Sequence, residues 1–324
     1  MRLDLYSNLP APRSPLPALS MPDRITIIGA GAWGNALANL TRVNGNEPTI
    51  WSRNCGRDLA ETILDRTAII SAVSMSGVRA VIDRLRGSID PQQIIVTATK
   101  GLDAQTNLTP AQLWHQAFPH NPIVVLSGPN LSLEIQQGLP AATVVASDNA
   151  DAANTVQEIF SSPKFRVYTN DDPVGVEIAG TVKNVIAIAA GTCDGLKLGN
   201  NAKSALLTRG LAEIIRIGQY WGGNTATFYG LSGLGDLLAT CNSPLSRNYQ
   251  VGYGLAQGKG LSEVLADLQG TAEGINTTQV LMQIANHNQI YMPITALVDR
   301  LLQGQITAPE AIIALMSRDR KSEY

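Results

Sequence analysis

The sequence predicts an α/β N-terminal domain built on a mostly parallel sheet, followed by an all-α C-terminal domain. Short β-rich segments alternate with helical segments from residue 24 to about residue 170, a pattern typical of a parallel sheet covered on both faces. After about residue 170 only helical patterns follow. The length of 324 residues also suits two domains, at about 150 residues each.

The composition excludes several classes of protein. Hydrophobic residues make up 44% of the chain and charged residues 15%, which excludes a disordered protein. The formal net charge is −2 and no run rich in Lys or Arg occurs, so we expect no nucleic-acid partner. No continuous run of 18 or more apolar residues occurs, so we expect no membrane span.

The three cysteines, Cys55, Cys193 and Cys241, lie far apart and lack the spacing of metal ligands. They are typical of small apolar side chains in a reducing compartment, which favours a cytoplasmic protein without a metal site.

The chain divides into three regions. Residues 1–20 contain four prolines and no clean apolar signal core, so we expect a flexible N-terminal extension. Residues 21–170 form the α/β domain and residues 171–324 the helical domain. The candidate strands lie at 24–29, 48–51, 67–73, 93–99, 122–128, 141–147 and 165–169.

The segment 176–191 is apolar nearly all round, which predicts a buried helix. Further helices are expected at 204–221, 261–268, 276–289, 293–303 and 308–316.

A glycine-rich turn follows the first strand directly and opens a helical segment. Gly29 permits the tight turn, Gly31 lets the backbone approach a pyrophosphate, and Gly34 allows the helix to pack closely on the strand. The N-terminus of the helix supplies N–H groups and a positive dipole. Because the strand, turn, helix and next strand arrive in order, the motif predicts a Rossmann-type domain that binds a dinucleotide.

The end of the second strand bears on the choice of cofactor. A site selective for NAD usually has Asp or Glu there, to accept a hydrogen bond from the ribose 2′-hydroxyl. Here Ser52 and Arg53 follow Trp51, and no carboxylate occurs before Asp58. Arg53 suits a 2′-phosphate, which favours NADP(H) over NAD(H), with a solvated surface arginine as the alternative.

Two lysines lie in unusual settings. Lys100 ends an uncharged strand, at the edge where open α/β sheets bind ligands. Lys183 lies in the middle of the apolar segment 176–191. An unpaired buried ammonium is costly, so Lys183 is either functional or part of a structural ion pair. Partial burial lowers the pKa of a lysine toward the range useful for proton transfer.

Three further groups carry polar chemistry. The segment 127–130 is another strand end that turns into a helix. Asp236 is a lone carboxylate in a glycine-rich apolar segment, which indicates either a helix cap or the partner of a buried cation. Ser246, Arg247 and Asn248 suit a phosphate, with an ordinary surface loop as the alternative.

The motifs GAGAWG, ATKGL, SGPN, VKNVIAIAAG, GLGDLLATC and SRN occur in this order between residues 24 and 316. In this set the chain resembles the bacterial-type NAD(P)-dependent glycerol-3-phosphate dehydrogenases. The resemblance implies reversible reduction of dihydroxyacetone phosphate to sn-glycerol 3-phosphate, which feeds phospholipid synthesis, by a homodimer.

The resemblance also implies roles for individual residues. Lys183 is the proton donor and acceptor, and Lys100 and Asp236 complete its polar cluster. The residues implied to hold substrate are Lys100, Gly128, Asn130, Lys183, Asp236, Ser246, Arg247 and Asn248. Those implied to bind the cofactor are Gly29, Gly31, Ala32, Trp33, Gly34, Arg53, Lys100, Ser132, Arg247 and Glu273.

Two other functions compete with this one. A β-hydroxyacid or 6-phosphogluconate dehydrogenase would place an asparagine four residues after its catalytic lysine, where this chain has Ala187. A redox-sensing module that only holds a dinucleotide would not need converging lysines. One departure from the family pattern is the short segment 52–67, which leaves the adenosine side of the predicted pocket more open.

Overall fold

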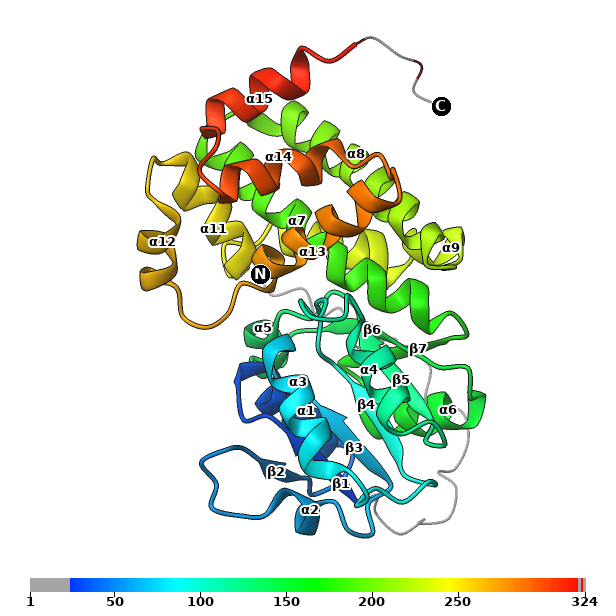
Figure 1. The fold of residues 1–324 in the computed structure, drawn as a ribbon. Coiled ribbons are helices and arrows are strands. Elements are labelled where there is room, and N and C mark those ends of the chain that lie inside the picture. The colour runs from blue at the N-terminus through cyan, green and yellow to red at the C-terminus, as the bar shows by residue number, and fades with distance from the viewer. Residues whose placement is uncertain (1–23, 320–321, 323–324) are drawn as a thin grey trace, which may run out of the picture.

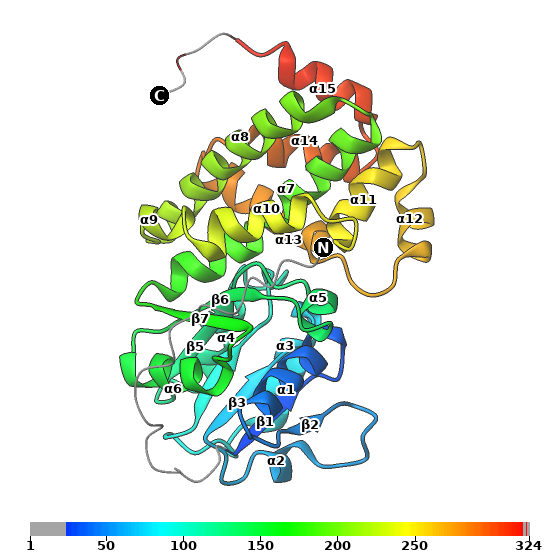
Figure 2. The same cartoon turned by 180° about the vertical axis from the view of Figure 1, so that it is seen from behind.

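The computed structural model describes residues 24–319 and 322. The predicted extension at 1–20 lies outside the described residues. Figures 1 and 2 show a sheet flanked by helices and, stacked on one end of it, a second layer made only of helices. The predicted fold class is therefore confirmed.

The N-terminal region contains a seven-stranded sheet with the order β2-β1-β3-β4-β5-β6-β7. Strands β1 to β5 are parallel, whereas β6 pairs with β5 in the antiparallel sense and β7 runs parallel to β6. The bounds are β1 Ile25–Ile28, β2 Thr49–Trp51, β3 Ala68–Ser71, β4 Ile94–Thr97, β5 Ile123–Ser127, β6 Ala141–Ala146 and β7 Phe165–Asn170.

Helices cover both faces of this sheet. Strands β1, β3 and β4 are therefore buried throughout, and their apolar side chains pack against helices on each side. One apolar cluster joins the sheet to α1, α5 and α6, and another joins it to α2, α3 and α4. The bounds are α1 Ala32–Val43, α2 Leu59–Thr62, α3 Met75–Leu85, α4 Pro110–Ala117, α5 Ser132–Gln136 and α6 Ala150–Phe160.

The sheet has a switch point between β1 and β3, because the chain leaves β1 toward β2 on one side and returns to β3 on the other. In open α/β sheets, ligands bind at the carboxyl ends of the strands beside such a point. The β1–α1 turn lies at that end, and so does Lys100, which follows β4.

The C-terminal region is built around the long helix α7, Pro173–Gly195, which is buried on nearly all sides as predicted. It is apolar and long enough to cross a membrane by length and composition, but most of it is buried inside the protein, as in a core helix. The surrounding elements are α8 Gly199–Tyr220, α9 Thr225–Phe228, the π-helix η1 Leu231–Gly235, α10 Asp236–Cys241, α11 Arg247–Ala256, α12 Leu261–Asp267, α13 Glu273–His287, α14 Pro293–Leu302 and α15 Ala308–Met316.

Helices α7 and α11 pack backbone against backbone. A Cβ atom added to Gly252 would lie 1.8 Å from the carbonyl oxygen of Ile188, and one added to Gly191 would lie 2.0 Å from that of Tyr249. Only glycine fits at these two positions, so the distance between the helices is fixed. This contact holds the N-terminus of α11 at a set distance from Lys183, eight residues earlier in α7 than Gly191.

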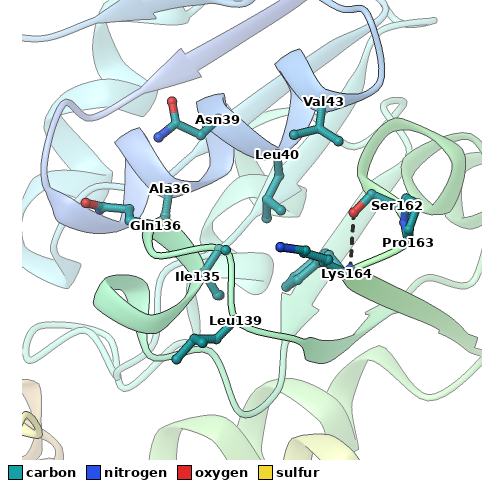
Figure 3. Close-up of a pocket in the computed structure, with 12 residues that line it drawn as sticks. Ala36, Asn39, Leu40, Val43, Ile135, Gln136, Leu139, Ser162, Pro163 and Lys164 are labelled. Atoms are coloured by element: carbon teal, nitrogen blue, oxygen red, sulfur yellow. Dashed lines mark hydrogen bonds between the residues drawn. The ribbon is translucent and has the colours of Figure 1, made fainter. Parts of the chain in front are cut away.

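A mostly apolar pocket of about 350 Å³ lies on the outer face of the sheet domain. Figure 3 shows the side chains that line it. It lies between α1, α5 and the turn before β7, and is lined by side chains that include Leu40, Ile135 and Leu139. None of the predicted site residues lines it, and its one cation, Lys164, is exposed.

Candidate active site

The β1–α1 turn has the geometry of a phosphate cradle. A Cβ on Gly29, whose φ is +120°, would lie 2.6 Å from the carbonyl oxygen of Ala72, and one on Gly34 would lie 1.9 Å from that of Gly29. These two glycines are required by the fold itself. Gly31 is different, because a Cβ there would meet nothing within 4 Å. The space beside Gly31 is therefore open to a ligand.

The first turn of α1 directs backbone N–H groups toward this space. Gly31 is the N-cap residue and provides no side-chain cap, so the helix end retains its hydrogen-bonding capacity and positive dipole for an anion. Trp33 donates from Nε1 to the carbonyl oxygen of Ala98 at 3.3 Å, and Gln136 of α5 donates to that of Ala32 at 2.8 Å. These contacts fix the start of α1 against the segment that follows β4 and against α5, which begins at Ser132. The arrangement fits the pyrophosphate of a dinucleotide.

Arg53 lies apart from the other predicted residues, exposed in the turn that follows β2. The nearest following carboxylate, Asp58, caps α2 by accepting from the backbone nitrogens of Ala60 and Glu61 at 2.8 and 3.2 Å. That side chain is thus engaged in holding its own helix.

Lys100, Lys183 and Asp236 meet in one cluster. Lys183 Nζ lies 2.7 Å from Asp236 Oδ1, and Lys100 Nζ lies 2.5 Å from Asp236 Oδ2. The side chain of Asp236 is only 2% exposed and that of Lys183 only 8%, whereas Lys100 reaches the surface of the cluster at 21%. Of the two roles left open for Asp236, the structure shows the partner of a buried cation, Lys183, with the partly exposed Lys100 as a second partner.

Thr240 completes this cluster, and the sequence did not predict it. Its hydroxyl lies 2.5 Å from Lys183 Nζ and 3.1 Å from Asp236 Oδ1. Thr240 lies one turn after Asp236 in α10, so the spacing of four residues places both side chains on one face. The spacing of four residues indicates a shared helix face only when a helix is expected, and the sequence pattern predicts no helix over this segment.

Charge and burial set the protonation of the cluster. Burial lowers the pKa of Lys183 to about 8, with the charge of Asp236 acting in the opposite direction and that of Lys100 in the same direction. Burial acts to raise the pKa of Asp236, but the ammonium groups of Lys100 and Lys183 outweigh it and hold that pKa below its ordinary value. A buried carboxylate therefore stays ionised beside a lysine that can exchange a proton near neutral pH.

The segment after β5 contributes a second wall. The carbonyl oxygen of Gly128 accepts from Lys100 Nζ at 3.3 Å. Asn130 donates from Nδ2 to Thr143 Oγ1 at 2.9 Å, which orients the amide. Its Oδ1 is buried and has no hydrogen-bond partner among the described residues. An oriented acceptor without a partner suits a ligand hydroxyl.

Residues 246–248 form the N-terminus of α11 rather than a surface loop. Ser246 is the N-cap and accepts from the backbone nitrogen of Tyr249 at 3.3 Å. Asn248 accepts from the nitrogen of Gly274 at 2.9 Å, and a Cβ on Gly274 would lie 2.7 Å from the carbonyl oxygen of Asn184. This segment is therefore held next to the residue that follows Lys183, with the exposed Arg247 at its edge.

Glu273, the first residue of α13, links the two regions. Its carboxylate accepts from the backbone nitrogen of Met75, the first residue of α3, at 3.2 Å. Burial raises the pKa of Glu273, and the charge of Arg247 opposes that effect. Arg247 and Glu273 thus lie near one another at the same edge of the sheet as the glycine turn.

Within residues 24–319, no group of three or more His, Cys, Asp or Glu side chains is arranged to hold a metal ion.

Comparison with known proteins supplies the family. The family model described as NAD-dependent glycerol-3-phosphate dehydrogenase N-terminus matches residues 24–57 and 54–153, and the model for the C-terminus matches residues 172–313. The N-terminal match is divided at 54–57, within the segment 52–67 that departs from the family pattern.

Individual proteins agree with the family models. A protein from Nostoc sp. named glycerol-3-phosphate dehydrogenase (NAD(P)+) is 61% identical over 301 residues, covering 93% of this chain and 98% of that protein. One of the same name from Synechocystis sp. is 55% identical, covering 94% of this chain and 96% of that protein. The crystal structure of glycerol-3-phosphate dehydrogenase from Coxiella burnetii superposes with a TM-score of 0.88 at 34% identity, covering 92% of this chain and 99% of that one. The chain therefore belongs to the NAD-dependent glycerol-3-phosphate dehydrogenase family of oxidoreductases.

Proposed function

We propose that this protein reduces dihydroxyacetone phosphate to sn-glycerol 3-phosphate with NAD(P)H and catalyses the reverse reaction. The observation that carries this proposal is the cluster of Lys100, Lys183 and Asp236 beside the dinucleotide edge of the sheet. In this proposal residues 21–170 bind the dinucleotide, and residues 171–324 supply the proton donor and most of the substrate contacts.

The cluster suits reduction of a ketone. A bound nicotinamide would supply a hydride to the ketone carbon, and the carbonyl oxygen then takes up negative charge. Lys183 donates a proton to this oxygen, so one hydride and one proton are consumed for each alcohol formed. Lys100 stabilises the same developing charge. Asp236 stays ionised between the two lysines and holds both ammonium groups in place.

The phosphate of the substrate would lie at the N-terminus of α11. Ser246, Arg247 and Asn248 provide a hydroxyl, a guanidinium and an amide there, beside the backbone N–H groups of the first turn. Gripping the phosphate away from the reacting carbon supplies binding energy that positions the carbonyl. Asn130 Oδ1, buried without a partner among the described residues, suits the free hydroxyl of the substrate.

NADPH is the preferred cofactor in this proposal, with NADH also accepted. Arg53 stands exposed at the end of β2, where a carboxylate would favour NADH, and Asp58 is occupied in capping α2. The Nostoc relative is named for NAD(P)+, which leaves both cofactors open. We further propose that the protein is a cytoplasmic homodimer whose product feeds phospholipid synthesis.

The two competing functions have less support. At the position of the asparagine expected of a β-hydroxyacid dehydrogenase, Ala187 is fully buried among apolar side chains. A module that only binds a dinucleotide has no use for a buried cluster with two cations and one anion, because burying charges costs free energy.

The test follows NADPH absorbance at 340 nm. Dihydroxyacetone phosphate is assayed with NADPH in the direction of reduction. In the direction of oxidation, sn-glycerol 3-phosphate, a 3-hydroxyacid and 6-phosphogluconate are each assayed with NADP+. We expect turnover with dihydroxyacetone phosphate and with sn-glycerol 3-phosphate only. Turnover with a hydroxyacid, or cofactor binding without any turnover, would replace this proposal with one of the two competing functions.

A further inference from the structure

One turn of α7 shapes the surroundings of Lys100. A Cβ on Gly180 would lie 2.3 Å from Ser127 Oγ and 3.4 Å from Lys100 Cε, so the missing side chain at this position leaves room for the lysine stem. The next residue, Thr181, is fully buried, and Lys183 follows two positions later. Lys100 belongs to the sheet domain, yet its side chain runs along the core helix of the other domain.

The backbone after Lys100 is anchored from the helical domain at two points. Gly101 donates its backbone N–H to Thr181 Oγ1 at 3.1 Å, and both partners are buried. Asn276 of α13 donates from Nδ2 to the carbonyl oxygen of Leu102 at 2.7 Å. The side chain of Leu102 is fully buried and packs in the apolar core of the helical domain. The segment that carries Lys100 is thus held by the domain that carries Lys183.

We propose that Thr181 is a positioning residue, which holds the Lys100 ammonium against Asp236, and thus close to Lys183, by accepting the hydrogen bond from Gly101. Its function depends on the proposed role of Lys183 as proton donor. Asn276 acts in the same way from α13, at the next residue of the anchored segment.

The proposal has a consequence for acid–base behaviour. The charged or titratable groups that act on Lys183 are Asp236, Lys100 and Cys241, and Thr240 contacts it by hydrogen bond. When the Lys100 ammonium moves away from Asp236, Lys183 loses a nearby positive charge, and Asp236 then pairs with Lys183 alone. Both changes raise the pKa of Lys183. Because reduction needs protonated Lys183, its rate then falls at a higher pH than in the native protein.

Thr181→Val tests this directly, since valine keeps the shape and removes the acceptor. We expect kcat for reduction to fall by about three- to tenfold, the equivalent of one ordinary hydrogen bond. The falling limb of the kcat–pH profile should move to higher pH than in the native protein. Thr181→Ser should restore both values because it keeps the hydroxyl, and Thr155→Val, at a partly exposed threonine of α6, should change neither.

A merely structural role gives a different result. In that case Thr181→Val lowers the melting temperature but leaves the falling limb of the kcat–pH profile in place, or Thr181→Ser is as impaired as Thr181→Val. Either result overturns the proposal. If Thr181→Val does not fold, Asn276→Leu removes the other anchor and should move the same limb upward. An unmoved limb there also overturns it.

The test also separates this inference from the proposed function. The Nζ resonance of Lys183, assigned with Lys183→Arg, can be titrated by ¹⁵N NMR in the native protein and in Thr181→Val without any substrate. A raised midpoint in Thr181→Val supports the positioning role even if the protein does not reduce dihydroxyacetone phosphate. An equal midpoint rejects the role even if it does.

Discussion

The glycine turn after β1 and the lysine cluster beside β4 lie at the same edge of the sheet, but they are built differently. The turn comes from one short segment and acts through its backbone, with Gly29 and Gly34 required by the fold and Gly31 facing open space. The cluster comes from three separate elements and acts through side chains, with Asp236 joined to Lys183 and Lys100 across 53 and 136 positions of sequence. The geometry of a local motif can therefore be predicted from the spacing of its residues. For a cluster that the fold assembles from distant segments, the sequence indicates only that the individual residues lie in unusual settings.

The strongest way to separate the two regions is Lys183→Ala. It removes the proposed proton donor, and we expect kcat to fall by about 10²- to 10⁴-fold, the usual contribution of a general acid. Asp236 keeps Lys100 as a partner, so the fold and the glycine turn should remain intact. NADPH affinity, measured by fluorescence titration, should stay within about twofold of native. Lys164→Ala, at an exposed lysine, is the control, and near-native turnover of Lys183→Ala would remove Lys183 from the mechanism.

Arg53→Glu tests the cofactor side alone. A charge-assisted contact to a 2′-phosphate corresponds to about ten- to a hundredfold in affinity, so the ratio of kcat/KM for NADPH over NADH should fall by that factor. Glutamate repels the phosphate and accepts from the ribose hydroxyls of NADH. Arg300→Glu, at an exposed arginine of α14, makes the same charge change away from the turn. An unchanged ratio in Arg53→Glu would mean that Arg53 points only to solvent.

Two glycines of the turn give a matched pair. Gly31→Ala adds a methyl group where the protein has open space, so NADPH should bind about tenfold more weakly while the melting temperature stays the same. Gly34→Ala forces a methyl group against the carbonyl oxygen of Gly29 and should destabilise the fold by about 1–3 kcal/mol. Calorimetry and fluorescence titration of both variants measure the difference. Equal melting temperatures for the two variants would show that the glycines are not divided between ligand and fold.

Glu177→Gln probes how α7, which carries Lys183, is held to the sheet domain. Glu177 accepts from the backbone nitrogen of Ala111 at the start of α4 at 2.8 Å, and burial raises its pKa to about 7 from 4.5. The folded state then holds a proton that the unfolded state releases above about pH 4.5. The stabilisation is complete below that pH and is lost as the pH rises through about 7.

Urea unfolding at pH 5 and pH 8 measures this contribution. The native protein should lose more stability between the two values than Glu177→Gln does, because the amide carries no titrating proton. Glu61→Gln, at an exposed glutamate in α2, should follow the native protein. Equal losses in the native protein and Glu177→Gln would show that Glu177 does not control this contact.

The sequence predicted the parts of the molecule in which one pattern dominates. The seven strands, the turn at residues 29–34 and the buried helix around Lys183 were visible because their apolar patterns and glycine spacing are local. Helices between residues 225 and 256 were not predicted, because the glycines at 230, 233, 235, 252 and 254 weaken the helical signal. Those glycines are explained by packing, such as Gly233 against the carbonyl oxygen of Phe228, and such contacts exist only in the folded chain.

The ends of helices are also poorly predicted from local sequence patterns, because contacts in the folded chain help to set them. The buried helix expected at 176–191 extends over Pro173–Gly195, because Asp172 caps it and Pro173 suits its first turn. The helix expected at 276–289 begins at Glu273, where the bond to Met75 lies in the other domain. Thr240 was missed because a threonine is unremarkable until the helix around it is known.

The contact between α7 and α11 constrains how enzymes of this architecture can be recombined. Gly252 and Gly191 seat one backbone on the other with no side chain to absorb a change in spacing. A chimera that takes α11 from a protein with alanine at position 252 would force the two helices apart, and the N-terminus of α11 would move away from Lys183. Exchanging residues 173–195 and 247–256 together preserves the close contact between α7 and α11. The two helices must therefore be exchanged as a pair, although more than fifty residues separate them in the chain.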